Sequence, residues 1–453
     1  MNKYDEMTKS SVKKLVMRLS LPTTISMLVT SLYNMADTYF VSQLGDSPSA
    51  AISVVFSIMT LIQSLGYTIG MGCGSMLSRC LGSKDNDGAN KHASQGFLMA
   101  LVLGGLFTLF GLIFRSELIT LIGATDSAKP YAIEYATWII IACPFMMTSF
   151  VMNNILRSEG KPYLSMIGLG LGGLLNIVLD PLLISAFDLG IAGAGIATMI
   201  SQIISFIILL SFFIFHRSTT RLSLSYISLD WKSYWEALKC GLPTLVRQGC
   251  GTTSNIILSF LGKPYGDAVV AALGVTNKIY MICRNIVIGF GQGFMPIIGY
   301  NYGAKKYGRI KEGFLFTMSL QTTFCLLATA IILIFPGKLI ALFRDTPEVI
   351  EVGTKAIRML AISLPFLGFS TIVNQCLQVM GYVKSATLLA SCRQGIIYTP
   401  LIFALEHFFG TTGLSLTQPC SDFITALISI PFCIYLFHML SDKKEEKVAD
   451  LDN

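Results

Sequence analysis

Long apolar runs, separated by short polar segments, recur along the whole chain. Runs of about 20 apolar residues have the length that an α-helix needs to cross a membrane. The pattern predicts twelve such helices, over residues 15–41, 50–78, 92–114, 130–152, 162–184, 190–215, 236–261, 268–297, 312–335, 349–376, 384–406 and 411–440. Little room is left for a soluble domain, so we expect an all-α integral membrane protein whose function lies in the membrane.

The longest polar stretch between predicted helices, HRSTTRLSLSYISLDWKSYW from His216, separates two sets of six. We therefore expect a first lobe over residues 1–217 and a second lobe over residues 234–453. Residues 218–233 are expected to form a cytoplasmic linker that contains an amphipathic interfacial piece.

Equal spacings relate the two sets of helices. The same separation along the chain joins Pro22 with Pro243, Asn153 with Asn374, and Gly160 with Gly381. We therefore expect two homologous six-helix bundles. Because six helices separate equivalent positions, the repeats should have the same orientation, with an axis along the membrane normal and a central cavity between the bundles.

The two halves differ at acidic positions. Asp37 interrupts the first apolar run, LPTTISMLVTSLYNMADTYFVSQLGD, and an Asp at the middle of a membrane helix costs about 2.5–3.5 kcal/mol on insertion scales. Its counterpart in the second half is Leu258, and the counterpart of Asp180 is Thr399 once the following prolines are aligned. We therefore expect two buried carboxylates that the second half lacks, and a function where they lie.

The candidate cation site consists of Asp37, Asn176, Asp180 and Thr198. Asn176 and Asp180 share a helix face, and Pro181 frees a carbonyl one turn earlier. Carboxylate, amide, hydroxyl and carbonyl oxygens suit a hard cation such as sodium, and they also suit a proton relay. Two carboxylates held together away from water cannot both ionise cheaply, so they would take up a proton or share a cation. In the alternative interpretation, helix-to-helix hydrogen bonds satisfy the Asp and serve structure only.

Pro22 lies near the start of the first apolar run. It removes a backbone donor and clashes with the preceding turn, so the first helix is expected to bend or break there. Pro243 has the same place in the second half, which indicates a hinge that belongs to the architecture of both halves.

The second half carries basic residues inside its predicted helices: Arg247, Lys278, Arg284 and Arg393. Arg284 and Arg393 lie mid-helix, where a side chain cannot easily reach the interface, whereas Arg247 lies nearer a helix end and can snorkel. Contact with an anionic substrate and a structural pairing, with Glu406 or a carbonyl, are both open interpretations.

Aromatic and methionine side chains could line a cavity for organic cations through cation–π and soft contacts, although such residues often face lipid or the core. The candidates for a substrate cavity are Tyr33, Asn34, Asn153, Lys278, Arg284 and Arg393.

Composition and charge agree with a membrane protein. The chain is 53% hydrophobic and only 13% charged, against about 25% charged in soluble proteins. The net charge of +7 requires no nucleic acid, because the basic residues cluster in alternate loops, as orientation signals do. These loops predict a multi-pass protein of the cell membrane with both termini in the cytoplasm, and the N-terminal segment predicts no removable signal peptide.

Several function classes lack their sequence signal. The chain has no GxxxxGK[ST] phosphate loop, its four histidines form no HExxH motif, and its eleven scattered cysteines form no metal or disulfide pattern. No nucleophile with a neighbouring base is visible. We therefore expect no enzyme activity and no cofactor apart from sodium or a proton as coupling ion. We also expect the protein to be a monomer.

Four stretches together form a recognisable pattern. They are the LP near the start of the first helix with an Asp fifteen residues on, NIVLDP in the fifth helix, GIAGAGIAT entering the sixth, and FGQGFMPIIGYNYGAKK in the eighth. Together they resemble the multidrug and toxic compound extrusion (MATE) family, and the resemblance covers nearly the entire chain. It is closest to the bacterial branches that keep acidic residues in the first lobe.

The resemblance implies a V-shaped pair of six-helix bundles that exports organic cations and drugs in exchange for sodium ions or protons. It implies that Asp37, Asn176, Asp180 and Thr198 form the first-lobe cation site, and that the first helix bends at Pro22 when the occupancy of that site changes. Another branch places a Glu in helix 7 and an Asp in helix 10, and this sequence has neither. A second-lobe cation site is therefore not expected.

An alternative function is a flippase for a lipid-linked precursor. Related flippases share the bundle architecture and use basic cavity residues for phosphates, and Lys278, Arg284 and Arg393 are residues of that kind. The sequence neither names the substrate nor chooses between sodium and protons.

Overall fold

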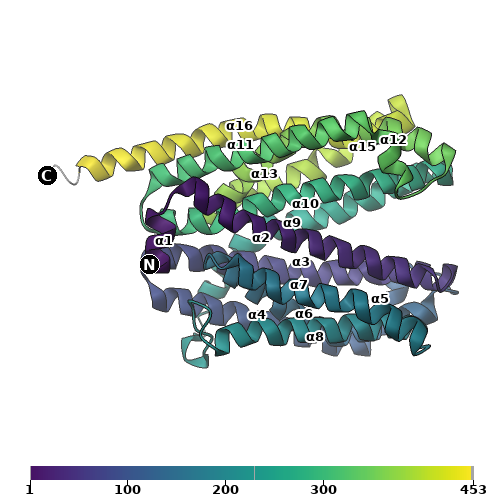
Figure 1. Ribbon diagram of the computed structural model, residues 1–453, viewed down its shortest axis with the longest axis horizontal. Coiled ribbons are helices and arrows are strands. Elements are labelled where there is room, and N and C mark those ends of the chain that lie inside the picture. Colours follow the sequence, from purple (N-terminus) through teal and green to yellow (C-terminus); the bar gives the residue numbers. More distant parts are fainter. Residues whose placement is uncertain (1, 229, 450–453) are drawn as a thin grey trace. The chain divides into compact units, whose positions relative to one another are not determined.

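The computed structural model describes residues 2–449 except residue 229, and no side chain is described at Asn34, Ser42, Asp46 or residues 442–449. All regular elements in this part of the chain are helical (Figure 1). The fold class predicted from the hydropathy pattern is thereby confirmed, and most helix ends lie within a few residues of their predicted places.

The long helices of the first half are α2 (Val12–Ser42), α3 (Asp46–Gly82), α4 (Asn86–Ile113), α6 (Lys129–Ser158), α7 (Pro162–Pro181) and α8 (Gly190–Ile214). Those of the second half are α9 (Trp231–Gly262), α10 (Asp267–Gly303), α11 (Tyr307–Ile334), α13 (Pro347–Met380), α14 (Val383–Ser391), α15 (Tyr398–Phe409) and α16 (Thr411–Ala449). Shorter helices are α1 (Lys3–Lys9), α5 (Arg115–Ile122) and α12 (Pro336–Ala341). Two π-helical turns, Leu182–Ala186 and Cys392–Ile396, follow α7 and α14.

Among the described residues, eleven helical segments are long and apolar enough to cross a membrane. The twelfth predicted span, 236–261, forms α9, which has 32 residues but is not among these eleven. Polar side chains such as Arg247, Gln248 and Asn255 lower the hydropathy of α9. This helix therefore has the length of a span and a more polar composition than the others.

The chain divides into two compact units. The first unit is Ile25–Gly241, and the second unit combines Met1–Thr24 with Leu242–Asn453. The boundaries lie inside α2 and α9, close to Pro22 and Pro243, and the predicted linker 218–233 folds with the first unit. The opening segment of α2 therefore packs with helices of the second half, and the opening segment of α9 packs with helices of the first half.

Glycines allow the first segments of α2 and α9 to pack closely against the helices of the unit that each segment joins. In the first unit, a Cβ atom on Gly72 would collide with the carbonyl of Ala237 on α9. In the second unit, a Cβ atom on Gly293 would collide with Ser20 on α2, and the Thr23 hydroxyl donates to the Gly289 carbonyl at 2.8 Å. Because only glycine fits at such positions, the crossing helices meet backbone to backbone.

One central helix organises each unit. In the first unit α6 packs against α3, α4, α7 and α8, and in the second unit α13 packs against α10, α11 and α16. The most apolar window of α6 is 83% buried and that of α13 is 61% buried. The two helices carry Pro144 and Pro365, which have the same spacing as Pro22 and Pro243, so the duplication extends to packing.

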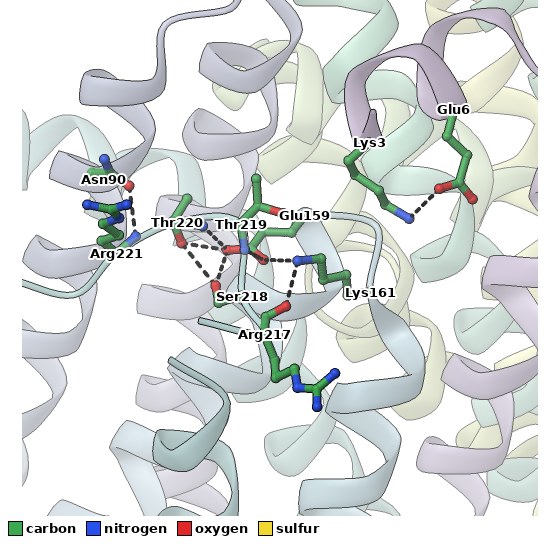
Figure 2. Close-up of polar contacts among 10 residues, drawn as sticks. All are labelled: Lys3, Glu6, Asn90, Glu159, Lys161, Arg217, Ser218, Thr219, Thr220 and Arg221. Atoms are coloured by element: carbon green, nitrogen blue, oxygen red, sulfur yellow. Dashed lines mark hydrogen bonds and ion pairs between the residues drawn. The ribbon is translucent and has the colours of Figure 1, made fainter. Parts of the chain in front are cut away.

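The connection between the halves is tied to the first unit through Glu159, at the end of α6. This fully buried carboxylate accepts hydrogen bonds from the Ser218 hydroxyl at 2.6 Å and from the backbone N–H groups of Thr219 and Thr220 at 2.7 and 3.0 Å (Figure 2). The amphipathic interfacial piece expected here is one 3₁₀ turn, Leu224–Tyr226, before α9 begins. The segment forms no longer helix, because its backbone groups make hydrogen bonds to side chains of the first unit.

Candidate functional site

Asp37 lies on the part of α2 that belongs to the first unit, and only 5% of it is exposed. Tyr135 on α6 donates a hydrogen bond to Asp37 Oδ2 at 2.8 Å. Because Tyr135 is fully buried as well, this bond is shielded from water and orients the carboxylate. The other oxygen, Asp37 Oδ1, has no hydrogen-bond partner among the described residues.

Asn176 and Asp180 lie one turn apart near the end of α7, and both are buried. Asn176 Nδ2 donates to Asp180 Oδ1 at 3.1 Å and to Thr198 Oγ1, on α8, at 3.3 Å. The predicted sharing of one helix face therefore corresponds to a real contact. Pro181 ends α7, and the π-helical turn Leu182–Ala186, a feature frequent near functional sites, follows at once.

The two carboxylates belong to one cluster. Asp37 and Asp180 interact electrostatically, and Tyr135 lies within the field of both. The sequence left open whether these acids meet in space, and the packing of α2, α6 and α7 brings them together. Two like charges in a buried cluster repel each other unless a proton or a cation joins them.

Three buried oxygens of this cluster have no donor among the described residues: Asp37 Oδ1, Asn176 Oδ1 and Asp180 Oδ2. A buried polar atom without a partner costs about 1–3 kcal/mol, so three in one cluster require an explanation. Carboxylate and amide oxygens are the ligands that hard cations take in proteins. The residues present therefore fit a bound sodium ion or a shared proton.

Small residues on α7 allow the helices of the cluster to approach each other. A Cβ atom on Gly173 would lie 3.1 Å from the ring of Tyr33 on α2. Ser205 on α8 donates to the Gly168 carbonyl at 3.0 Å. The glycine run GLGLGG is thus a close-packing face that places α7 against α2 and α8.

The predicted cavity residues of the first half have different surroundings. Tyr33 is buried, and its hydroxyl accepts a hydrogen bond from Gln63 Nε2 at 3.5 Å. Asn153 is fully buried and donates to the Ser165 carbonyl at 3.1 Å, which joins α6 to α7. The side chain of Asn34 lies outside the described part of the structure.

The bond made by Asn153 has a repeat in the second unit. Asn374 donates to the Ala386 carbonyl at 2.5 Å, and both residues follow their first-half counterparts at the common spacing of the duplication. Because both units keep the bond, it belongs to the duplicated architecture, and it connects a central helix to the helix that follows.

Arg393 does not pair with Glu406. Its Nε lies 3.6 Å from Asp422 Oδ1, on α16, and Tyr280 on α10 donates to Asp422 Oδ2 at 2.6 Å. Glu406 instead accepts a hydrogen bond from Tyr265 at 2.7 Å. Arg393 and Asp422 are both buried, so they form an ion pair inside the second unit.

The second half has no carboxylate at the positions equivalent to Asp37 and Asp180, but it has a fully buried one elsewhere, Asp422. When Pro181 is aligned with Pro400, Asp422 falls opposite Ile203. The acid therefore occupies a position with no acidic counterpart. Comparing the halves only at the positions of Asp37 and Asp180 could not reveal it.

Lys278 was expected to be buried and is exposed. It lies one turn after the exposed Gly274, so the two share an exposed strip of α10. Arg284 and Arg247 are half-buried. The basic candidates of the second half therefore separate into an exposed lysine and partly or fully buried arginines.

Two members of these clusters were not among the site residues that the sequence predicted. Tyr135 carries no local signal, because a tyrosine in an apolar helix is ordinary and its partner is 98 residues away. Asp422 did carry one, since it interrupts the apolar run 411–440 in the same way that Asp37 interrupts the first. The cost of placing an Asp inside a membrane helix applies equally to Asp37 and Asp422.

The chain is similar in sequence to known families and proteins. The model of the MatE family matches residues 22–182 and 243–404, two segments that begin at Pro22 and Pro243. The chain is 28% identical over 441 residues to the multidrug export protein MepA of Staphylococcus saprophyticus, covering 97% of each chain. It is 27% identical over 445 residues to MepA of Staphylococcus aureus, covering 98% of this chain and 97% of the relative.

Solved structures share the fold. One is a multidrug resistance MATE family transporter in an outward-facing conformation, with 25% identity, a TM-score of 0.91 and coverage of 97% of this chain and 98% of that chain. Another is a MATE transporter in complex with MaL6, with 24% identity, a TM-score of 0.92 and coverage of 98% and 100%. The second likeness concerns the fold alone.

Proposed function

Because the chain belongs to the MatE family, we propose that it is a cation-coupled antiporter that exports drugs and other organic cations across the cell membrane. The family consists of multi-pass membrane transporters, and the chain is not an enzyme. Similar proteins are named multidrug export proteins, which supports drugs as substrates. The positions of the basic loops support an orientation with both chain ends in the cytoplasm.

The observation that carries the proposal is the buried cluster of Asp37 and Asp180, with three oxygens that lack a donor among the described residues. The coupling ion, when bound, supplies positive charge between the carboxylates. Tyr135 holds one oxygen of Asp37 in place, and Asn176 orients Asp180 and reaches Thr198. The chain thus supplies an oriented set of acceptors that can hold either sodium or a proton.

The position of Asp37 connects this cluster to helix α2. An ion can shift a transporter between conformations only through a difference in affinity for them. Asp37 lies on the segment of α2 in the first unit, and Pro22 lies on the segment grouped with the second unit. We propose that occupancy of the cluster changes the bend of α2 at Pro22, and that external cation binding favours the conformation that releases drug outward.

Transport from proteoliposomes under imposed gradients tests this function. Efflux of an ethidium-type cation would be measured first with a sodium gradient alone and then with a proton gradient alone. We expect efflux under at least one of them, which identifies the coupling ion, and loss of that efflux in Asp180→Asn protein reconstituted at equal amount. No efflux under either gradient, or unchanged efflux in both Asp37→Asn and Asp180→Asn, would rule the proposal out.

A further inference from the structure

Three arginines line a hollow inside the second unit. Arg247 reaches it from α9, Arg284 from α10, and Arg393 from the π-helical turn Cys392–Ile396. Its volume is about 500 Å³ when its open mouth is included. We call this hollow, with its three arginines, the basic hollow. Its remaining lining is neutral and includes Asn374 and Thr425.

The charges of the basic hollow do not balance. Only Arg393 has a carboxylate partner, Asp422, and the residues that line the hollow include no acid. In the part of the chain that the structure describes, Arg247 and Arg284 have no carboxylate within 4.0 Å, and Arg284 Nε has no hydrogen-bond partner. Three guanidinium charges and one carboxylate leave two positive charges uncompensated.

A structural role does not account for this arrangement. The guanidinium groups repel each other, since Arg247 lies in the field of both Arg284 and Arg393. Charged groups within membrane helices are rare and are normally paired or turned toward a water-filled path. Two unpaired arginines that face one hollow, beside a third arginine with a partner, therefore indicate a negatively charged ligand.

We propose that the basic hollow binds a dianionic phosphate group of the kind that a phosphate monoester carries. Two ligand charges match the two uncompensated arginines, and the planar forks of guanidinium bind phosphate oxygens in pairs. The buried hydroxyl of Thr425, on α16, lines the hollow and has no partner among the described residues, so it is a further donor. The acidic cluster of the first unit has the opposite charge, so the two sites select different ligands.

The phosphate monoester can come from a lipid headgroup or from a soluble ester, and a binding experiment with two arms separates the sources. The purified full chain, in lipid nanodiscs of phosphatidylcholine, would be titrated with labelled glycerol phosphate. In the second arm, labelled phosphatidic acid would be titrated in mixed micelles, with phosphatidylglycerol, a phosphate diester, as the comparison lipid. Saturable binding of the monoester in either arm is expected, and the arm that binds identifies the source.

The variants Arg247→Gln and Arg284→Gln test the site itself. Each is expected to weaken binding about tenfold or more, because hydrogen bonds to charged groups are lost. Arg284→Lys should retain more binding than Arg284→Gln. The matched control is Arg358→Gln, which replaces an exposed arginine of α13 that does not line the hollow and should leave binding unchanged.

The stability of the ligand-free variants separates a ligand site from a structural role. Because Arg247 lies in the field of two other arginines and has no carboxylate partner among the described residues, Arg247→Gln should keep or raise the melting temperature without ligand. Absence of saturable binding in both arms would overturn the proposal. Binding by the Arg247→Gln/Arg284→Gln double variant equal to that of the wild type, or an equal loss in Arg358→Gln, would overturn it as well. So would a lower melting temperature of both single variants together with unchanged binding.

Discussion

The acidic cluster of the first unit and the equivalent positions of the second unit share helices but not chemistry. The first-half residues Asp37, Tyr135, Asn176, Asp180 and Thr198 correspond to Leu258, Ala356, Gly395, Thr399 and Thr417. Leu258 and Ala356 line a hollow of the second unit whose lining contains no charged residue. The two halves share the bond that Asn153 and Asn374 make to the following helix, whereas the positions equivalent to Asp37 and Asp180 are neutral in the second half.

The charges of the second unit lie elsewhere and are arranged differently. Asp422 has Arg393 beside it and accepts a hydrogen bond from Tyr280. In the described part of the chain, Asp37 and Asp180 take part in no ion pair and keep oxygens without donors. A buried acid with an arginine partner is already satisfied, whereas two acids without one are poised to take up a proton or a cation.

Replacing the two acids of the first half by the residues of the second half should have the largest effect on transport. Asp37→Leu and Asp180→Thr install the second-half residues and remove the acceptors of the coupling ion, so drug resistance conferred in cells should be abolished. The membrane level of the protein should not fall, because an Asp inside a membrane helix costs about 2.5–3.5 kcal/mol. Resistance and membrane level would both be measured.

The matched control for these variants is Leu258→Met, at the position equivalent to Asp37. It conserves volume and should cost less than about 1.5 kcal/mol, with resistance unchanged. Resistance that survives in both Asp37→Leu and Asp180→Thr would mean that the acidic cluster does not couple transport.

Breaking the ion pair of the second unit should lower stability rather than coupling. Asp422→Asn leaves Arg393 without its carboxylate, and loss of one partner of a buried pair costs about 3–5 kcal/mol. The double variant Arg393→Gln/Asp422→Asn removes both charges and should recover part of this loss. Melting curves of the purified proteins would measure both, and Asp422→Asn protein as stable as the wild type would contradict the pairing.

Glu159 offers a second comparison of the halves, because its counterpart in the duplication is the apolar Met380. Glu159→Gln removes a charged acceptor from the segment Ser218–Thr220, where hydrogen bonds to a charged group contribute about 1.5–3 kcal/mol. The connection should detach more often, so limited trypsin digestion should cut faster at Arg217 and Arg221.

Glu312→Gln, at an exposed position of α11, is the control for this digestion and should be cut at the wild-type rate. Equal rates for Glu159→Gln and the wild type would show that other contacts hold the connection in place.

The smallest effect is expected for Tyr135→Phe. It removes only the hydroxyl that donates to Asp37, and such a bond contributes about 1 kcal/mol, roughly a fivefold change in affinity. Because this donor stabilises the carboxylate that holds no proton, a proton-coupled transporter should reach half-maximal efflux at a proton concentration lower by about that factor, while maximal efflux stays near the wild-type value. If sodium is the coupling ion, the carboxylate stays ionised in both states and the sodium concentration for half-maximal efflux should change by less than that factor. Tyr398→Phe, at a buried tyrosine of the second unit, should leave this concentration unchanged, and an equal shift in both variants would contradict the role of Tyr135.

Much of the fold was predictable, because its signals are local or repetitive. Hydropathy located the helices, and one constant spacing between matching residues, as from Pro22 to Pro243, located the duplication. The contact between Asn176 and Asp180 was predictable as well, since both lie on one face of one helix. The burial of Arg393 beside Asp422 depends on neighbouring helices, and for this pair the hydropathy pattern carried no sufficient signal.

The sequence by itself determined an all-helical membrane protein built from two related halves, with Asp37 and Asp180 at positions that are neutral in the second half. Helix formation and membrane insertion depend on properties of short segments, which a sequence states directly. Only the tertiary structure decided that Tyr135 meets Asp37, that Asp37 and Asp180 share a cluster, and that three arginines face one hollow. These contacts join segments that are distant in the sequence, and their geometry depends on how glycine-lined helices pack against one another.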